Sequence, residues 1–179
     1  MHRYLHLYTF LFIYLASCSK PLSNPAFYSS NNDQKLISRV KKEIQNLEKQ
    51  TGKRFTGNSI KIHEPIKAKY SDWRGMPIAK IRGNFQGGLT SWKLLDQRAS
   101  IYLAHNNKQI PDWLIRHECL HAILLSNNII GHPKKYVKHF SKAYYWTEET
   151  EWVPNKIITS GDREILNASC SICKSVVIR

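Results

Sequence analysis

Acidic residues are scarce in this chain of 179 residues. It holds 13 Asp and Glu against 27 Lys and Arg, a formal net charge of +14. A protein surface with this excess of positive charge attracts anionic partners through long-range electrostatics. The Lys residues are scattered rather than clustered, so a solvated basic surface is the simplest interpretation.

The chain also lacks a long hydrophobic run. Its most apolar stretch, residues 1–18 (MHRYLHLYTFLFIYLASC), is too short and too interrupted for a comfortable transmembrane helix. Arg3 near the start, an apolar middle and small residues before Cys18 are typical of a secretory signal. Small residues directly before a cysteine resemble the lipobox of bacterial lipoproteins. This resemblance implies that Cys18 is lipidated and becomes the first mature residue.

The lipobox resemblance implies a lipid-anchored protein of the bacterial cell envelope. Ser19 follows Cys18, so the Asp that retains lipoproteins at the inner membrane of enteric bacteria is absent. In a cell with two membranes we therefore expect the outer membrane. Export argues against nucleic acid as a partner and favours lipid headgroups, lipopolysaccharide or cell-wall polymers. An uncleaved anchor and an ordinary signal peptide are the alternatives.

No internal repeat is present, and the length suits one domain. We predict a signal peptide over 1–17, a lipidated Cys18 with a Ser-, Asn- and Pro-rich tether over 18–34, and a domain over 35–179. Apolar periodicity predicts helices over 33–50, from Pro111 onward and over 134–146. Strands are predicted over 59–63, 76–85 and 99–106, with a further one over 153–158. This order indicates an α+β fold.

Cysteines are few, at four. Cys119 is predicted to be a buried core thiol. Cys170 and Cys173 form a Cys-x-x-Cys pair, interpreted as a local disulfide in an oxidising compartment, with free thiols as the alternative.

The most informative motif is His117-Glu118-Cys119-Leu120-His121. It lies in a segment that is apolar on nearly every side, which predicts a buried helix. Residues i and i+4 share a helix face, so both imidazoles can reach one metal ion. Glu118 is turned by about 100° and suits a water beside the metal better than the ligand pair. A metal and its water would satisfy these buried polar groups, whereas a solvated helix end is the alternative.

A catalytic zinc site needs a third protein ligand. Gly131 permits a sharp turn and Pro133 suits the start of a new helix, so the favoured candidate is His132. The other candidates are His105, His139, Glu148, Glu149 and Glu151.

The motif on a helix preceded by a strand resembles the zincin metallopeptidases, over roughly residues 99 to 140. The resemblance implies a small sheet behind the active helix, zinc on His117 and His121, and Glu118 as general base. Leu124 and Asn127 stand where metzincins have Gly and His, so the chain is not a metzincin.

The resulting hypothesis is a membrane-anchored zinc metallopeptidase, expected to be monomeric, that hydrolyses protein or peptide substrates. Tyr136, Tyr144 and Tyr145 are candidate donors to the oxyanion. The alternative is a non-catalytic zinc-binding or basic envelope lipoprotein that binds a partner or an anionic polymer.

Overall fold

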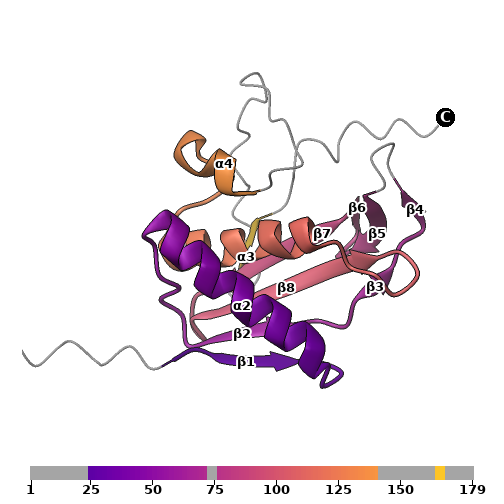
Figure 1. Cartoon of the computed structure of the whole chain (residues 1–179), viewed down its shortest axis with the longest axis horizontal. Coiled ribbons are helices and arrows are strands. Elements are labelled where there is room, and N and C mark those ends of the chain that lie inside the picture. Colours follow the sequence, from indigo (N-terminus) through magenta and orange to yellow (C-terminus); the bar gives the residue numbers. More distant parts are fainter. Residues whose placement is uncertain (1–23, 72–75, 141–163, 168–179) are drawn as a thin grey trace, which may run out of the picture.

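The computed structural model describes residues 24–71, 76–140 and 164–167. Two long helices cover one face of a mostly parallel sheet (Figure 1). The strands of this sheet run in the order β1-β2-β8-β7-β9, and β3 pairs with β8 outside this path. Three further strands, β4-β5-β6, make a smaller sheet. The predicted α+β class is confirmed.

The first helix is α2 (Gln34–Thr51), which agrees with the helix predicted over 33–50. Asp33 caps it, because its side chain accepts a hydrogen bond of 2.9 Å from the Leu36 backbone N–H. Gly52 ends it in the left-handed conformation, with a φ of 68°. The side chains of its buried stripe pack into the main core: Leu36, Val40, Ile44 and Leu47.

The parallel part of the sheet consists of β1 (Ala26–Ser29), β2 (Ser59–Ile62), β3 (Ile66–Lys67) and β8 (Arg98–His105). The predicted strands at 59–63 and 99–106 are confirmed as β2 and β8. Strand β1 lies within 18–34, where a tether was predicted, so the fold begins before residue 35. These four residues (AFYS) form a strand by pairing with β2, which is distant in the sequence.

The stretch predicted as one strand over 76–85 is instead a hairpin of β5 (Pro77–Ile81) and β6 (Asn84–Gln86). Arg82 and Gly83 both have positive φ, of 48° and 92°, which suits a tight two-residue turn. Strand β4 (Tyr70–Ser71) pairs with β5.

Strand β7 (Gly88–Lys93) was not predicted from the sequence. It lies antiparallel between β8 and β9 (Glu164–Asn167).

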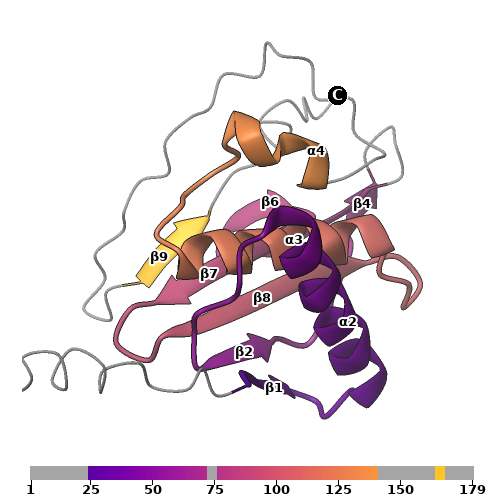
Figure 2. The same cartoon turned by 60° about the vertical axis from the view of Figure 1, so that its left-hand side comes forward.

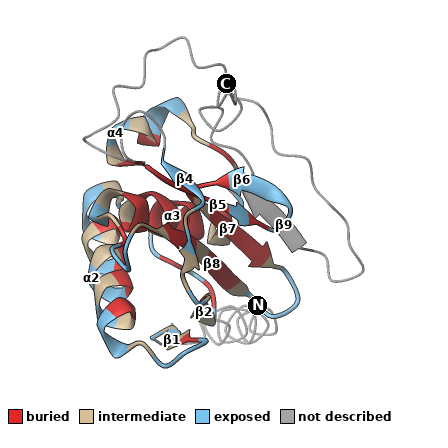
Figure 3. Ribbon diagram, turned by 90° about the vertical axis from the view of Figure 1, so that its right-hand side faces the viewer, coloured by how far each residue is buried: buried red, intermediate tan, exposed pale blue. Residues whose placement is uncertain are grey.

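The second long helix is α3 (Asp112–Ser126), and 11 of its 15 residues are buried. It packs on β7, β8 and α2, and its ribbon is mostly red in the burial view (Figure 3). Pro111 was predicted in the first helical position but is the N-cap, with an extended ψ of 138°. Cys119 is fully buried, as predicted.

After α3, a single 3-10 turn (Lys134–Tyr136) leads into α4 (Val137–Phe140), within the helix predicted over 134–146. Figure 2 shows α4 beside α3, on the side away from the sheet. The predicted signal peptide, the strand over 153–158 and the cysteines 18, 170 and 173 lie outside the described residues. Among the described residues, no helix is both long and apolar enough to cross a membrane.

Candidate metal centre

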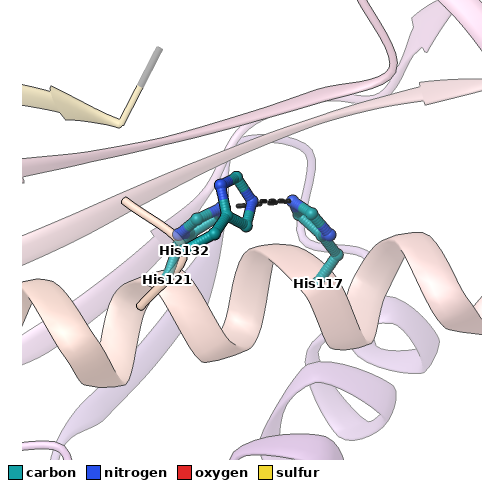
Figure 4. A group of neighbouring side chains, drawn as sticks. All are labelled: His117, His121 and His132. Atoms are coloured by element: carbon teal, nitrogen blue, oxygen red, sulfur yellow. Dashed lines mark hydrogen bonds between the residues drawn. The ribbon is translucent and has the colours of Figure 1, made fainter. Parts of the chain in front are cut away.

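Three histidines converge above the middle of α3. His117 and His121 come from successive turns of the helix, and His132 comes from the connection to α4 (Figure 4). The Nε2 atom of His117 lies 3.1 Å from Nε2 of His121 and 3.2 Å from Nε2 of His132. One ligand nitrogen of each residue lies within 4.8 Å of the others. His132, the favoured candidate for the third metal ligand, therefore lies next to His117 and His121.

The spacing of these nitrogens fits one shared cation. Two nitrogens bound tetrahedrally at 2.0–2.1 Å from a zinc ion lie about 3.3 Å apart. Hydrogen bonding alone explains the arrangement poorly, because Nε2 of a neutral imidazole carries either one proton or one lone pair. Nε2 of His117 approaches two other ring nitrogens and cannot make a normal hydrogen bond to both. The three side chains are thus close enough to bind a metal ion together.

The protonation state of the cluster also suits a metal. Burial lowers the pKa of His117 and His121 well below 6.5, and protonation of His132 would lower both pKa values further. Burial lowers the pKa of His132 to about 4. At pH 7 all three rings are therefore neutral, which is the form that coordinates a metal.

The loop after α3 turns His132 back over the helix. The backbone N–H of Ile129 donates to the Leu124 carbonyl at 2.8 Å, and Asn128 has a φ of 60°. Gly131 then adopts a φ of 79°, a conformation that favours glycine. The sharp turn predicted at Gly131 is confirmed, and it is this turn that points His132 toward α3.

A phenyl ring packs against the whole cluster. Phe140 of α4 is fully buried, and its centroid lies 4.9, 4.7 and 4.5 Å from those of His117, His121 and His132. Arg116 holds α4 in place, since its Nε donates to the His139 carbonyl at 2.8 Å. The same guanidinium bonds Glu43 and Gln50 of α2. An apolar neighbour of this kind restricts solvent access to a metal site.

Glu118 lies on the side of α3 that faces the sheet and is 3 % exposed. The Thr90 hydroxyl on β7 lies 2.7 Å from its Oε2 and 3.0 Å from its backbone carbonyl oxygen. Gly88 lies against the same carboxyl group, and a Cβ there would come within 2.5 Å of Oε1. Strand β7 therefore determines where the carboxyl group of Glu118 can lie.

Some predicted candidates lie elsewhere. The ring Nδ1 of His105 accepts a hydrogen bond from the Lys108 backbone N–H, and His139 contributes its carbonyl to Arg116. Neither ring belongs to the cluster of three His. Tyr136 is buried in the core, whereas Tyr144, Tyr145 and the three candidate glutamates at 148, 149 and 151 lie outside the described residues.

Three residues around the site were not predicted. Thr90 and Gly88 belong to a strand that gave no clear sequence signal, and Phe140 was expected only as part of a helix face. Thr90 and Gly88 contact Glu118 across 28 and 30 residues of sequence, and Phe140 contacts His132 across 8. Local sequence patterns do not reveal such contacts.

A scan against protein-family models gives no match, and searches of curated proteins and of solved structures also give none.

Proposed function

We propose that the chain is a zinc-dependent metallopeptidase with a zincin-like active-site helix. The observation that carries this proposal is the meeting of His117, His121 and His132, two of them on a helix that also carries the buried Glu118. Three protein ligands are typical of catalytic zinc sites, whereas structural sites normally have four. His117 and His121 of α3 and His132 would be the ligands.

Zinc is the metal that we propose, because imidazole nitrogen suits it and the three neutral rings fit a tetrahedral set. When bound, zinc supplies a Lewis acid and lowers the pKa of a water ligand to about 7.

Glu118 would act as general base. It would take one proton from the attacking water as the water oxygen bonds to the peptide carbonyl carbon. It would then deliver that proton to the leaving nitrogen as the C–N bond breaks. The Thr90 hydroxyl, 2.7 Å from Oε2, would keep the carboxyl group in one orientation during both transfers. Thr90 is thus a positioning residue rather than a catalytic one.

The substitution Glu118→Gln tests this assignment. The zinc-loaded chain and the variant are incubated with a mixed library of synthetic peptides, and cleavage is followed by mass spectrometry. The parent should cleave peptides, while Glu118→Gln should keep its zinc and lose turnover. Cleavage by the variant at the parental rate would refute the general-base role, and a zinc-loaded parent that cleaves nothing would refute the peptidase proposal.

We also propose that the protein is a monomer held at the bacterial envelope, with its lipid on Cys18 and its basic surface toward anionic polymers or lipids. Support comes from the lipobox-like sequence before Cys18 and from the formal net charge of +14. Intact-mass measurement of protein extracted from membranes tests the anchor, because an acylated chain without residues 1–17 is expected.

A further inference from the structure

The turn between β7 and β8 carries two neighbouring leucines in solvent. Leu95 is 72 % exposed and Leu94 is 41 % exposed, and Leu95 is the most exposed large hydrophobic side chain among the described residues. Single exposed apolar residues are ordinary, but two adjacent ones at a hairpin tip form a small exposed apolar patch.

This hairpin tip lies at the end of the sheet where β1 begins. The Ala26 backbone N–H donates to the Asn58 carbonyl at 3.0 Å, and the Asn58 N–H donates to the Gln97 carbonyl at 2.8 Å. Strand β1 and the β7–β8 turn therefore lie at one end of the sheet, on the left in Figure 1.

The same end bears positive charge. Lys49 and Arg54, at and after the end of α2, are exposed, and they line one hollow together with the half-buried Glu48, whose Oε1 accepts from the Phe55 backbone N–H at 2.8 Å. Lys93 precedes the turn. The acidic side chain in the turn is Asp96, and it pairs with Arg98 at 3.2 Å. Apolar side chains flanked by cations suit an anionic bilayer surface.

Chain length would keep this end near a membrane. Eight peptide links separate Cys18 from Ala26, and they span at most about 28 Å when fully extended. A lipid on Cys18 would therefore hold the start of β1, and the hairpin tip beside it, within that distance of the bilayer.

We propose that residues 94–97 form a membrane-docking tip, with Leu94 and Leu95 inserted among the headgroups of an anionic bilayer. The inference rests on the lipid anchor suggested above and is independent of peptidase activity. Docking through this end orients the molecule with its sheet end-on to the membrane. The hairpin of β5 and β6 then points away from the membrane.

The opposite end of the sheet supplies a matched control. Phe85 of β6 is 41 % exposed, like Leu94, and its ring lies 5.8 Å from that of Tyr70. Gly88, at the start of β7 just after Phe85, pairs with Leu103 near the far end of β8.

The test uses the full chain purified from membranes and reconstituted into phosphatidylglycerol vesicles, with or without brominated acyl chains that quench tryptophan. Leu95→Trp and Phe85→Trp each add one reporter to the same five native tryptophans. Bromination should quench the added signal of Leu95→Trp at least about threefold more than that of Phe85→Trp, because only an inserted side chain reaches the acyl boundary. The difference should shrink in phosphatidylcholine vesicles.

Equal quenching of the two reporters would overturn the docking proposal, as would burial of the Leu95→Trp reporter in a concentration-dependent dimer of this chain. Zinc content, measured on the same samples, reports separately on the metal site. A chain that docks but binds no zinc would refute the peptidase proposal alone, and a zinc-loaded chain that does not dock would refute the docking proposal alone.

Discussion

Replacing Thr90 with valine removes one hydroxyl from the core while keeping a side chain of nearly the same shape. Thr90 is fully buried on β7, and its Oγ1 lies 2.7 Å from Oε2 of Glu118 and 3.0 Å from the carbonyl oxygen of the same residue. The variant Thr90→Val therefore deprives a buried carboxyl group of this donor without opening a cavity.

The expected magnitude follows from burial. Losing one partner of a buried hydrogen bond costs about 1–3 kcal/mol, because the remaining polar group keeps its desolvation penalty. For a domain of this size each kcal/mol shifts the melting temperature by about 2–4 °C, so a fall of roughly 2–12 °C is expected. Turnover should fall more than zinc affinity, since the hydrogen bond that is lost holds Glu118, the proposed general base, and not one of the proposed His ligands.

Calorimetry of the metal-free chain gives the stability change, and peptide cleavage by the zinc-loaded chain gives the change in kcat. Thr90→Ser is the control, because it restores the hydroxyl and should recover most of both losses. A Thr90→Val protein as stable and as active as the parent would refute the claim that this hydroxyl holds Glu118. Loss of stability that serine does not restore would assign the effect to packing.

Further predictions concern the neighbouring residues and the pH. Gly88→Ala should destabilise the fold by about 1–3 kcal/mol, because the added Cβ would meet Oε1 of Glu118 at 2.5 Å. Gly83→Ala is the comparison: a Cβ there has nothing within 4 Å, but φ is positive, so this variant reports backbone strain alone. Equal costs of the two variants in denaturant unfolding would contradict the contact of Gly88 with Glu118. Arg116→Met should lower the free energy of unfolding by about 1–3 kcal/mol, because it removes the hydrogen bonds to the His139 carbonyl and to α2. It should also loosen the packing of α4, detected as faster hydrogen exchange of the Phe140 backbone amide. Unchanged exchange would contradict this role of Arg116. The free energy of unfolding of the metal-free chain should fall as the pH drops from about 6.5 toward 4. Burial lowers the pKa of the three clustered His in the folded state, so the unfolded chain binds more protons in that window; a flat profile would contradict their burial as neutral rings.

Local signals made the helices predictable. The apolar stripe of α2 repeats within one stretch of chain, and the helix that it predicts over 33–50 agrees with the structure. The motif on α3 predicted two of the clustered His from helix geometry alone. Gly131 made the return of His132 foreseeable, because a glycine turn limits where the next residue can lie.

The rest depends on contacts between distant segments. Strand β7 has no clean alternation, because Thr90, Ser91 and Trp92 are all buried between neighbouring elements. Strand β1 has only four residues and is defined by pairing with β2. The contact of Thr90 with Glu118 requires the register of β7 against β8 and the docking of α3, so no local pattern could indicate it.

The metal content of the purified full chain is the decisive measurement for the three-histidine site. It would be measured beside His117→Ala, His132→Ala and the control His105→Ala, whose ring lies outside the cluster. We expect about one zinc per chain in the parent and in His105→Ala, and loss of zinc in the other two variants, because catalytic sites use three protein ligands. A parent chain that takes up no zinc after reloading, or a His132→Ala chain that keeps it with parental affinity, would contradict the three-histidine site.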